Sequence, residues 1–176
     1  YRNRAKINDD IYVSGNLGDS YLGLLVLKNK ITLNSRLKRY FTNQYFTPNI
    51  QLKLIDHIKK FANTSIDVSD GLFTDIEKMI NSQMLSYKVD LKKIPISYNL
   101  KKVLALKKLS KINFISNGDD YQVLFTASKN KRRIIKKISS NYRIKLTQIG
   151  SIQSIANKSS IIDDKNRIIG LKNKGF

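Results

Sequence analysis

The 176-residue sequence contains no cysteine, no tryptophan, two prolines and one histidine. Without cysteine there are no disulfides and no thiolate metal sites, which agrees with a reducing cytoplasm, the localisation we expect. Any metal must be held by oxygen atoms, and this favours Mg²⁺ or Ca²⁺ over zinc. The only histidine, His57, lies among helix-forming residues, so we do not expect a catalytic imidazole.

Long apolar runs are also absent. No stretch of about 18 apolar residues occurs, so no membrane span is expected, and the basic opening 1–6 is not followed by the apolar segment of a signal peptide. A strand pattern starts so soon after residue 1 that the sequence reads like the interior of a longer protein. With 41% hydrophobic residues, the chain can still build the core of one globular domain.

Acidic residues are scarce, with 13 Asp+Glu against 33 Lys+Arg and a net charge of +20. Such an excess is typical of proteins that bind nucleic acid or anionic membranes. Here the lysines are scattered over nearly every segment together with Ile and Asn, a composition that an AT-rich coding sequence produces. No aromatic stacking motif is recognisable, so nucleic acid is not the expected partner, although a basic nucleic-acid-binding module remains an alternative.

Three of the scarce carboxylates fall within nine residues, at Asp67, Asp70 and Asp75. The apolar spacing changes here from the period of a strand to that of a helix, and the switch lies at Ser69-Asp70-Gly71. Glycine permits a close approach of the backbone, and we expect the new helix to offer free N–H groups to phosphate beside a metal. The alternative is that Asp70 or Ser69 caps the helix and Asp75 is solvated.

Two further loops have a similar composition. Gly118-Asp119-Asp120 precedes an apolar run, which places two adjacent carboxylates at the mouth of a buried strand, where a cation would relieve their repulsion. The glycine-bounded loop 15–18 links a strand to a helix and could cradle a phosphate. The alternatives are a solvated acidic turn and an ordinary turn whose helix is capped by Asp19 or Ser20.

Apolar strands alternate with amphipathic helices along the rest of the chain, which predicts an α/β (α+β) domain with a mixed sheet flanked by helices. Residues 31–48 look irregular. Within 49–63, a helix is predicted whose buried face consists of Leu52, Ile55, Ile58 and Phe61 or Ala62. The remaining expectations are a strand at 87–91, helices at 98–109 and 129–141, a strand at 144–149, and a hairpin of 160–162 with 167–169.

Taken together, the motifs resemble the C-terminal domain of thiamine-monophosphate kinase, within the group of aminoimidazole-ribonucleotide-synthetase-like ATP enzymes. Residues 9–20 resemble the family pattern G-D-x-I-Y-V-T-G-x-L-G-D-S, residues 67–75 resemble D-I-S-D-G-L-x-x-D-L, residues 118–126 resemble G-E-D-Y-E-L-L-F-T, and residues 149–152 resemble I-G-x-I. The second pattern is shared with sister synthetases of the aminoimidazole ribonucleotide or selenophosphate type, which remain an alternative. The third favours the thiamine enzyme.

The resemblance implies transfer of the γ-phosphate of ATP directly to thiamine monophosphate, with Mg²⁺ and without a phosphoenzyme. No covalent catalytic residue is therefore expected, because phosphoryl transfer needs mainly positioning and charge neutralisation. By the same resemblance, Asp67 and Asp70 are Mg²⁺ ligands, Arg2 and Ser69 contact ATP, and Asp119 and Phe176 contact the substrate.

The sequence departs from the family at three motif positions. Asn8 replaces a glycine, Gln51 replaces the arginine of a P-x-P-R segment, and Asp119 is one methylene shorter than the family's glutamate. We expect residues 1–176 to form a single C-terminal domain, with the family's N-terminal nucleotide-binding and dimerisation domain lying outside them. The full-length protein is then expected to be a homodimer, and the 176 residues alone are expected to be inactive.

Overall fold

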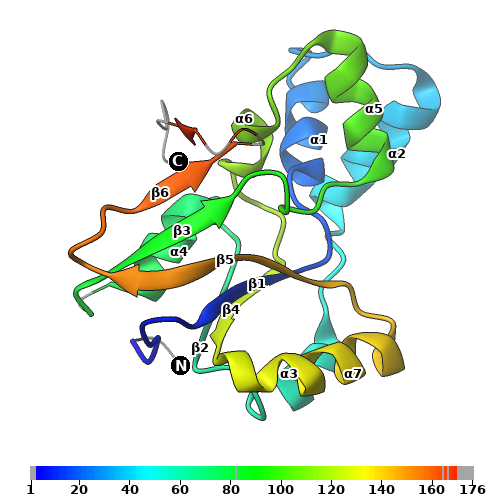
Figure 1. Cartoon of the computed structure of the whole chain (residues 1–176). Helices are drawn as coiled ribbons and strands as arrows, with labels where there is room; N and C mark the ends of the chain where they lie inside the picture. Colours follow the sequence, from blue (N-terminus) through cyan, green and yellow to red (C-terminus); the bar gives the residue numbers. More distant parts are fainter. Residues whose placement is uncertain (1–2, 82, 164, 166, 170–176) are drawn as a thin grey trace.

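The computed structural model describes residues 3–81, 83–163, 165 and 167–169. Over these residues the chain forms a seven-stranded sheet with the strand order β2-β4-β1-β5-β3-β6-β7 (Figure 1). The sheet is mixed, as predicted, because β3 and β6 pair in parallel and the other neighbours are antiparallel. The strands are β1 (Asp10–Ser14), β2 (Thr64–Asp67), β3 (Leu85–Asp90), β4 (Val123–Ala127), β5 (Leu146–Ser154), β6 (Ser160–Ile162) and β7 (Ile168–Ile169).

Helices flank the sheet in three places (Figure 1). Helix α4 covers one face, α3 and α7 cover the other, and α1, α2 and α5 form a group beside the sheet. The helices are α1 (Asp19–Leu27), α2 (Ser35–Phe46), α3 (Leu52–Ile58), α4 (Leu72–Met79), α5 (Tyr98–Lys107), α6 (Lys111–Ile115) and α7 (Arg132–Tyr142), with a 3-10 turn η1 (Lys129–Lys131) before α7. None of the helices in the described part of the chain is long and apolar enough to cross a membrane.

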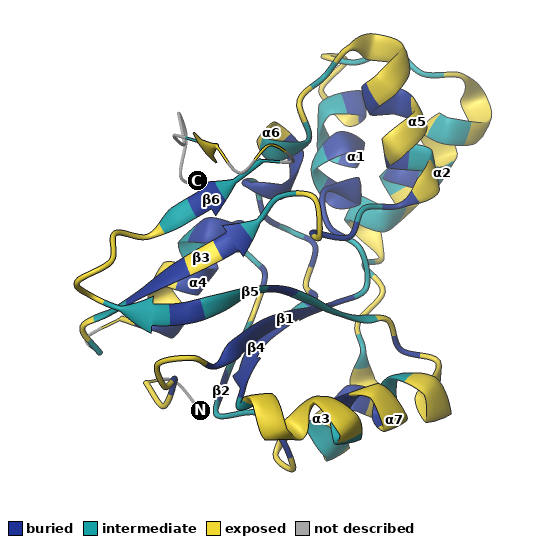
Figure 2. Ribbon diagram, viewed as in Figure 1, coloured by how far each residue is buried: buried dark blue, intermediate teal, exposed yellow. Residues whose placement is uncertain are grey.

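Strand β1 lies in the middle of the sheet and is buried along its whole length (Figure 2). Its side chains alternate between the two faces, as the period of a strand requires. Ile11 and Val13 join the apolar cluster that contains α4, whereas Tyr12 joins the cluster of α3 and α7. The ring of Tyr12 stacks on that of Phe125 in β4, with centroids 5.2 Å apart and planes 6° from parallel. The core therefore lies on both faces of β1.

The predicted irregular segment 31–48 is in fact largely helical, as α2. The side chain of Asn34 caps this helix by accepting a hydrogen bond from the Leu37 N–H at 3.0 Å. Phe41 is the residue of α2 that is fully buried, against α1 and α5. Leu37 and Tyr40 pack in the same cluster at helical spacing, so the periodic pattern was present in the sequence although it was interpreted as irregular.

Helix α3 is shorter than predicted, and its predicted buried face is confirmed only in part. Ile58, Phe61 and Ala62 pack in the cluster under the sheet as predicted. Leu52 and Ile55 are instead 67% and 57% exposed, and the completely buried residue of the helix is Leu54.

The C-terminal strands agree with the prediction in their pairing but not in every boundary. The predicted hairpin forms, with Ile161 opposite Ile169 and Ile162 opposite Ile168. Strand β5, expected to end before Gly150, continues to Ser154. Its register against β1 shifts between Ile11 and Tyr12, which is typical of a β-bulge.

Candidate active site

The topology of the sheet brings three predicted motifs to one edge. Strand β4 is antiparallel to both β1 and β2, so the ends of β1 and β2 lie beside the beginning of β4. The loops that continue from these points are loop 15–18, loop 68–71 and loop 116–122. Motifs that are about 50 residues apart in the sequence are therefore neighbours in space, as their combined interpretation as one site requires.

Loop 68–71 and loop 116–122 are connected by hydrogen bonds between their backbones. The Asp119 N–H donates to the Ser69 carbonyl at 3.1 Å, and the Tyr121 N–H donates to the Val68 carbonyl at 2.9 Å. A Cβ atom on Gly118 would lie 1.8 Å from the Ser69 carbonyl oxygen. Likewise, a Cβ on Gly71, whose φ is +119°, would lie 2.1 Å from the Ser116 oxygen. Both glycines are therefore required by the close approach of the two loops.

The N–H groups of the loop that leads into α4 are not free. Asp75 is wholly buried, and its Oδ2 accepts hydrogen bonds from the N–H groups of Ser69, Asp70 and Gly71 at 3.0, 3.0 and 3.1 Å. The solvated Asp75 and the side-chain cap by Asp70 or Ser69 that the sequence left open are both wrong, since the N-cap is Gly71 without a side-chain bond. The protein's own carboxylate thus occupies the place that a phosphate would take.

The same holds for loop 15–18, whose N–H groups the sequence offered to a phosphate. Asp120 is buried and accepts hydrogen bonds from the N–H groups of Gly18 at 2.7 Å and Ser20 at 3.4 Å. Asp19 and Ser20 do not cap α1, because Asp19 instead accepts hydrogen bonds from the hydroxyls of Tyr40 and Ser97. An internal carboxylate therefore again occupies the N-terminal end of a helix.

The adjacent acids Asp119 and Asp120 have different environments. Burial raises the pKa of the Asp120 carboxyl to about 8, although its backbone donors act in the opposite direction. Asp119 has a φ of +67° and is partly exposed at the edge of the sheet. The two carboxylates therefore do not face one ligand together: Asp120 is buried, and Asp119 is the one that a ligand can reach.

Asp70 is the acidic side chain of loop 68–71 that faces outward, with 41% of the side chain exposed. It forms an ion pair with Lys78 on α4, and the Lys78 ammonium also lies 3.6 Å from the buried Asp75 Oδ1. Asp67 is exposed at the end of β2. The sequence analysis missed Lys78, although its spacing of three residues from Asp75 is a recognisable helical charge pair.

The residues present fit a hard cation in their chemistry. Asp67 and Asp70 supply carboxylate oxygens, which Mg²⁺ prefers, and a positively charged group already lies against Asp70. Within the described residues, no three His, Cys, Asp or Glu side chains form a group that could hold a metal ion. Mg²⁺ commonly uses one or two carboxylates together with substrate phosphates. The chemistry of Asp67 and Asp70 thus fits the metal role predicted for them, which stays a prediction.

The buried side chain of Gln122 forms hydrogen bonds that connect three segments next to the site, a role that the sequence analysis did not predict. Its Oε1 accepts a hydrogen bond from the Ser14 hydroxyl at 2.8 Å, and its Nε2 donates to the Asn49 carbonyl at 2.9 Å. The same Ser14 oxygen accepts from the Val123 N–H at 2.9 Å. This network connects the end of β1, the beginning of β4 and the segment before α3.

The six residues singled out by the sequence fall into three groups. Ser69, Asp70 and Asp119 are brought together by the paired loops, and Asp67 lies at the same sheet edge. Arg2 and Phe176 lie outside the described residues.

Two of the positions at which the sequence departs from the family pattern keep a local role. Asn8 has a φ of +71°, a conformation that glycine adopts easily and asparagine tolerates, so the turn is kept. The Gln51 amide donates to the Asn49 carbonyl at 3.3 Å.

Comparison with known proteins gives this site a context. A thiamine-monophosphate kinase of Buchnera aphidicola subsp. Acyrthosiphon pisum (strain APS) is 35% identical over 179 residues, which cover 99% of this chain and 54% of the relative. The chain is homologous to thiamine-monophosphate kinases. It spans about half the length of the curated thiamine-monophosphate kinases that it matches, and the half is their C-terminal portion. No protein-family model matches the chain.

Solved structures of thiamine-monophosphate kinases have the same fold. The enzyme from Stenotrophomonas maltophilia K279a superposes with a TM-score of 0.78 at 28% identity, over 93% of this chain and 52% of that one. AaThiL complexed with AMPPCP and TMP superposes with a TM-score of 0.79 at 26% identity, over 99% and 52%. A hydrogenase maturation protein HypE has a TM-score of 0.66 at 12% identity, over 97% and 55%, a likeness of fold alone.

Proposed function

We propose that this chain is the C-terminal part of a thiamine-monophosphate kinase, which transfers the γ-phosphate of ATP to thiamine monophosphate and forms thiamine diphosphate. The observation that carries the proposal is the convergence of loops 15–18, 68–71 and 116–122 at one sheet edge. The 35% identity to a thiamine-monophosphate kinase supports this choice of substrate.

The reaction proposed is a direct in-line transfer in which the side chains bind and orient the two substrates. Asp67 and Asp70 would hold Mg²⁺, which when bound neutralises the charge of the phosphates. Ser69 would contact ATP, and Asp119, on the paired loop, would contact thiamine monophosphate. Arg2 and Phe176 keep their proposed contacts with ATP and with the substrate.

The buried acids have a different part in this proposal. Asp75 and Asp120 hold the backbones of loops 68–71 and 15–18, so the exposed side chains of those loops are fixed before a ligand arrives. Pre-organisation of this kind lowers the cost of ordering the site during catalysis. The net charge of +20 also attracts substrates that carry phosphates.

The whole enzyme is proposed to need more than these 176 residues. The relatives are about twice as long, and we propose that the remaining half supplies the rest of the nucleotide and metal site and the contacts of a homodimer. The 176 residues alone would then fold without catalysing the transfer.

The test is Asp70→Asn in the full-length protein, with formation of thiamine diphosphate measured against Mg²⁺ concentration. Loss of a metal-ligating carboxylate should lower activity by about a hundredfold and raise the Mg²⁺ requirement. Asp56→Asn, on the exposed side of α3, is the control and should leave both unchanged. Unchanged activity and Mg²⁺ dependence in Asp70→Asn would contradict the metal role. Turnover of an aminoimidazole precursor or of selenide instead of thiamine monophosphate would favour a sister enzyme.

A further inference from the structure

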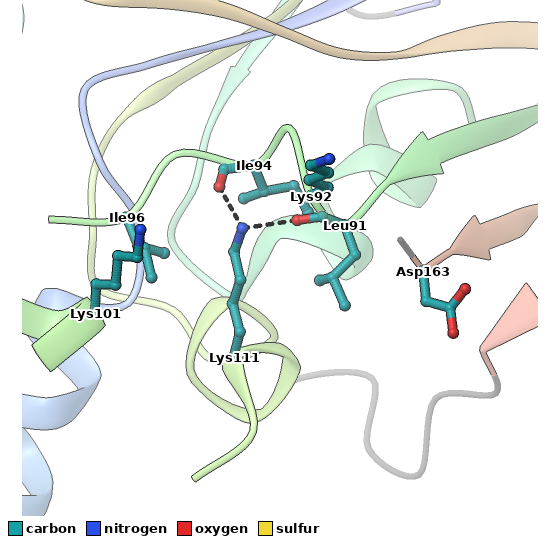
Figure 3. A pocket seen from close by; sticks show the side chains of 7 residues that line it. All are labelled: Leu91, Lys92, Ile94, Ile96, Lys101, Lys111 and Asp163. Atoms are coloured by element: carbon teal, nitrogen blue, oxygen red, sulfur yellow. Dashed lines mark hydrogen bonds between the residues drawn. The ribbon is translucent and has the colours of Figure 1, made fainter. Parts of the chain in front are cut away.

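A cavity of about 520 Å³ opens where the chain leaves β3 (Figure 3). Its walls combine the apolar side chains of Leu91, Ile94 and Ile96 with the ammonium groups of Lys92, Lys101 and Lys111. The volume is within the range of small-molecule sites. None of the lining residues belongs to loops 15–18, 68–71 or 116–122, so this is a separate feature of the molecule.

Lys111, the first residue of α6, reaches into the cavity from below its apolar wall (Figure 3). Its ammonium donates to the carbonyls of Leu91 at 2.7 Å and Ile94 at 2.5 Å. An ammonium has three N–H groups, so one donor is left without a partner among the described residues. Burial lowers the pKa of Lys111 to about 8, and neighbouring Lys145 and Lys101 act in the same direction, whereas the nearby Asp90 carboxylate raises this pKa and compensates part of the buried charge. A bound anion would compensate this unfavourable burial of charge.

The remaining charges of the lining favour an anion as well. Lys92 and Lys101 are exposed at the rim. Asp163 is the carboxylate of the lining, and it already accepts hydrogen bonds from the Arg167 guanidinium at 2.8 Å and from two backbone N–H groups. Among the described lining residues, the cavity therefore offers donors and apolar surface, and the carboxylate of Asp163 already has hydrogen-bond donors.

We propose that this cavity binds an organic phosphate, with the phosphoryl group at Lys111 and an apolar body against the half-buried Leu91 and Ile96. Lysine binds phosphate as a point charge, and three ammonium groups from different segments can surround one phosphoryl group. Inorganic phosphate alone would leave the apolar wall uncovered, so the apolar body should add affinity. The inference goes beyond the proposed kinase reaction and uses none of its residues.

One short helix, α6, connects this cavity to the candidate active site. Helix α6 starts at Lys111 and ends at Ile115, directly before loop 116–122. The Leu17 N–H also donates to the Pro95 carbonyl at 3.0 Å, which links the wall of the cavity to loop 15–18.

The experiment is a titration of the full-length protein with phenyl phosphate at about 0.15 M salt, where nonspecific attraction is screened. Binding is followed by the methyl NMR signals of Leu91, Ile94 and Ile96. We expect saturable binding, weakened about tenfold or more by Lys111→Met, which removes the part-buried charge, and severalfold by Lys101→Met. Lys107→Met is the matched control, because Lys107 is exposed on the same helix as Lys101 and does not line the cavity. Benzyl alcohol and inorganic phosphate should each bind more weakly than phenyl phosphate.

Three results would overturn the proposal: no saturation, an equal loss in Lys107→Met, or NMR shifts confined to loops 68–71 and 116–122. The first two would show only attraction to a basic protein, and the third would show binding at the kinase site. If Lys111→Met does not fold, the proposal is tested by comparing the affinities of Lys101→Met and Lys107→Met for phenyl phosphate. Weaker binding by Lys101→Met supports the proposal, and equal binding overturns it. Affinity should also fall as the pH rises through about 8, where Lys111 loses its proton. Kinase activity can be present or absent independently of these results.

Discussion

The carboxylate of Asp120 accepts a hydrogen bond of 2.7 Å from the backbone N–H of Gly18, a residue 102 positions earlier in the sequence. This bond ties loop 116–122 to the beginning of α1. Asp75 does the same within loop 68–71 through three N–H donors. The acids of the motifs therefore divide into those that hold the loops from inside and those, such as Asp70 and Asp119, that a ligand can reach.

Asp120 makes stability depend on pH. Its pKa rises from 3.8 to about 8 on folding, so the folded protein retains a proton that the unfolded chain has released over this range. Stability should therefore fall between about pH 4 and 8, by at most about 1.4 kcal/mol per pH unit for one proton. Burial raises the pKa of Asp19 as well, so part of the slope belongs to that residue.

Thermal unfolding of Asp120→Asn between pH 4.5 and 8 isolates the contribution of Asp120. The amide oxygen can still accept the bond from Gly18 but does not ionise, so the variant should lose less stability with rising pH than the natural sequence. Asp56→Asn, whose carboxylate is exposed, should keep the original slope. Parallel curves for Asp120→Asn and the natural sequence would show that Asp120 does not titrate in this range.

Removal of the Asp75 carboxylate should destabilise the protein strongly. Asp75→Ala leaves three N–H groups of loop 68–71 without their acceptor, and we expect a loss of about 3 kcal/mol in the free energy of unfolding. Urea denaturation measures this value. Asp56→Ala is the comparison for loss of an exposed carboxylate and should cost well under about 1 kcal/mol. A similar small loss for both variants would mean that the three bonds contribute little.

The contact between Gly118 and Ser69 has no room for a methyl group. Gly118→Ala places a Cβ 1.8 Å from the Ser69 carbonyl oxygen, so the two loops must separate. We expect a destabilisation of about 1–3 kcal/mol and a loss of kinase activity greater than the loss of stability explains. Asn113→Ala, at an exposed position of α6, is the control. Activity that simply follows stability would argue that the spacing of the loops has no separate role.

Lys78 should compete with a metal ion for Asp70. Lys78→Met removes the ammonium from the Asp70 carboxylate, so the Mg²⁺ concentration for half-maximal activity should fall by about two- to fivefold, as expected for an exposed ion pair. Direct binding of Mn²⁺, followed by its electron paramagnetic resonance signal, gives a reading independent of turnover. Lys53→Met, exposed on α3, should change neither value. A Mg²⁺ requirement that stays the same or rises would exclude such competition.

The sequence predicted the elements whose signal is local. The change of period at 67–72 and the hairpin of β6 with β7 depend on neighbouring residues, and both form as expected. Helix α2 was not predicted, although Leu37, Tyr40 and Phe41 have helical spacing and pack in one cluster. The buried face of α3 was predicted only in part, because tertiary packing covers Leu54 rather than Leu52 and Ile55.

For the site, the sequence identified the loops but not the role of each acid. The donors to Asp120 come from the distant residues Gly18 and Ser20, which no local pattern reveals. The donors to Asp75 lie only four to six residues before it, so this arrangement was in principle readable as an acid that caps its own helix.

The order of the strands in the sheet also determines the order in which the sheet can assemble. The first three strands of the chain, β1, β2 and β3, are not neighbours of one another, since each pairs with β4, β5 or β6. Within the described residues, β1, β2 and β3 therefore have no strand partner until β4 is synthesised. Such long sequence separations slow folding and leave edges exposed to aggregation. Pairing of β1 and β2 can thus begin only after β4 has been synthesised, and pairing of β3 only after β5.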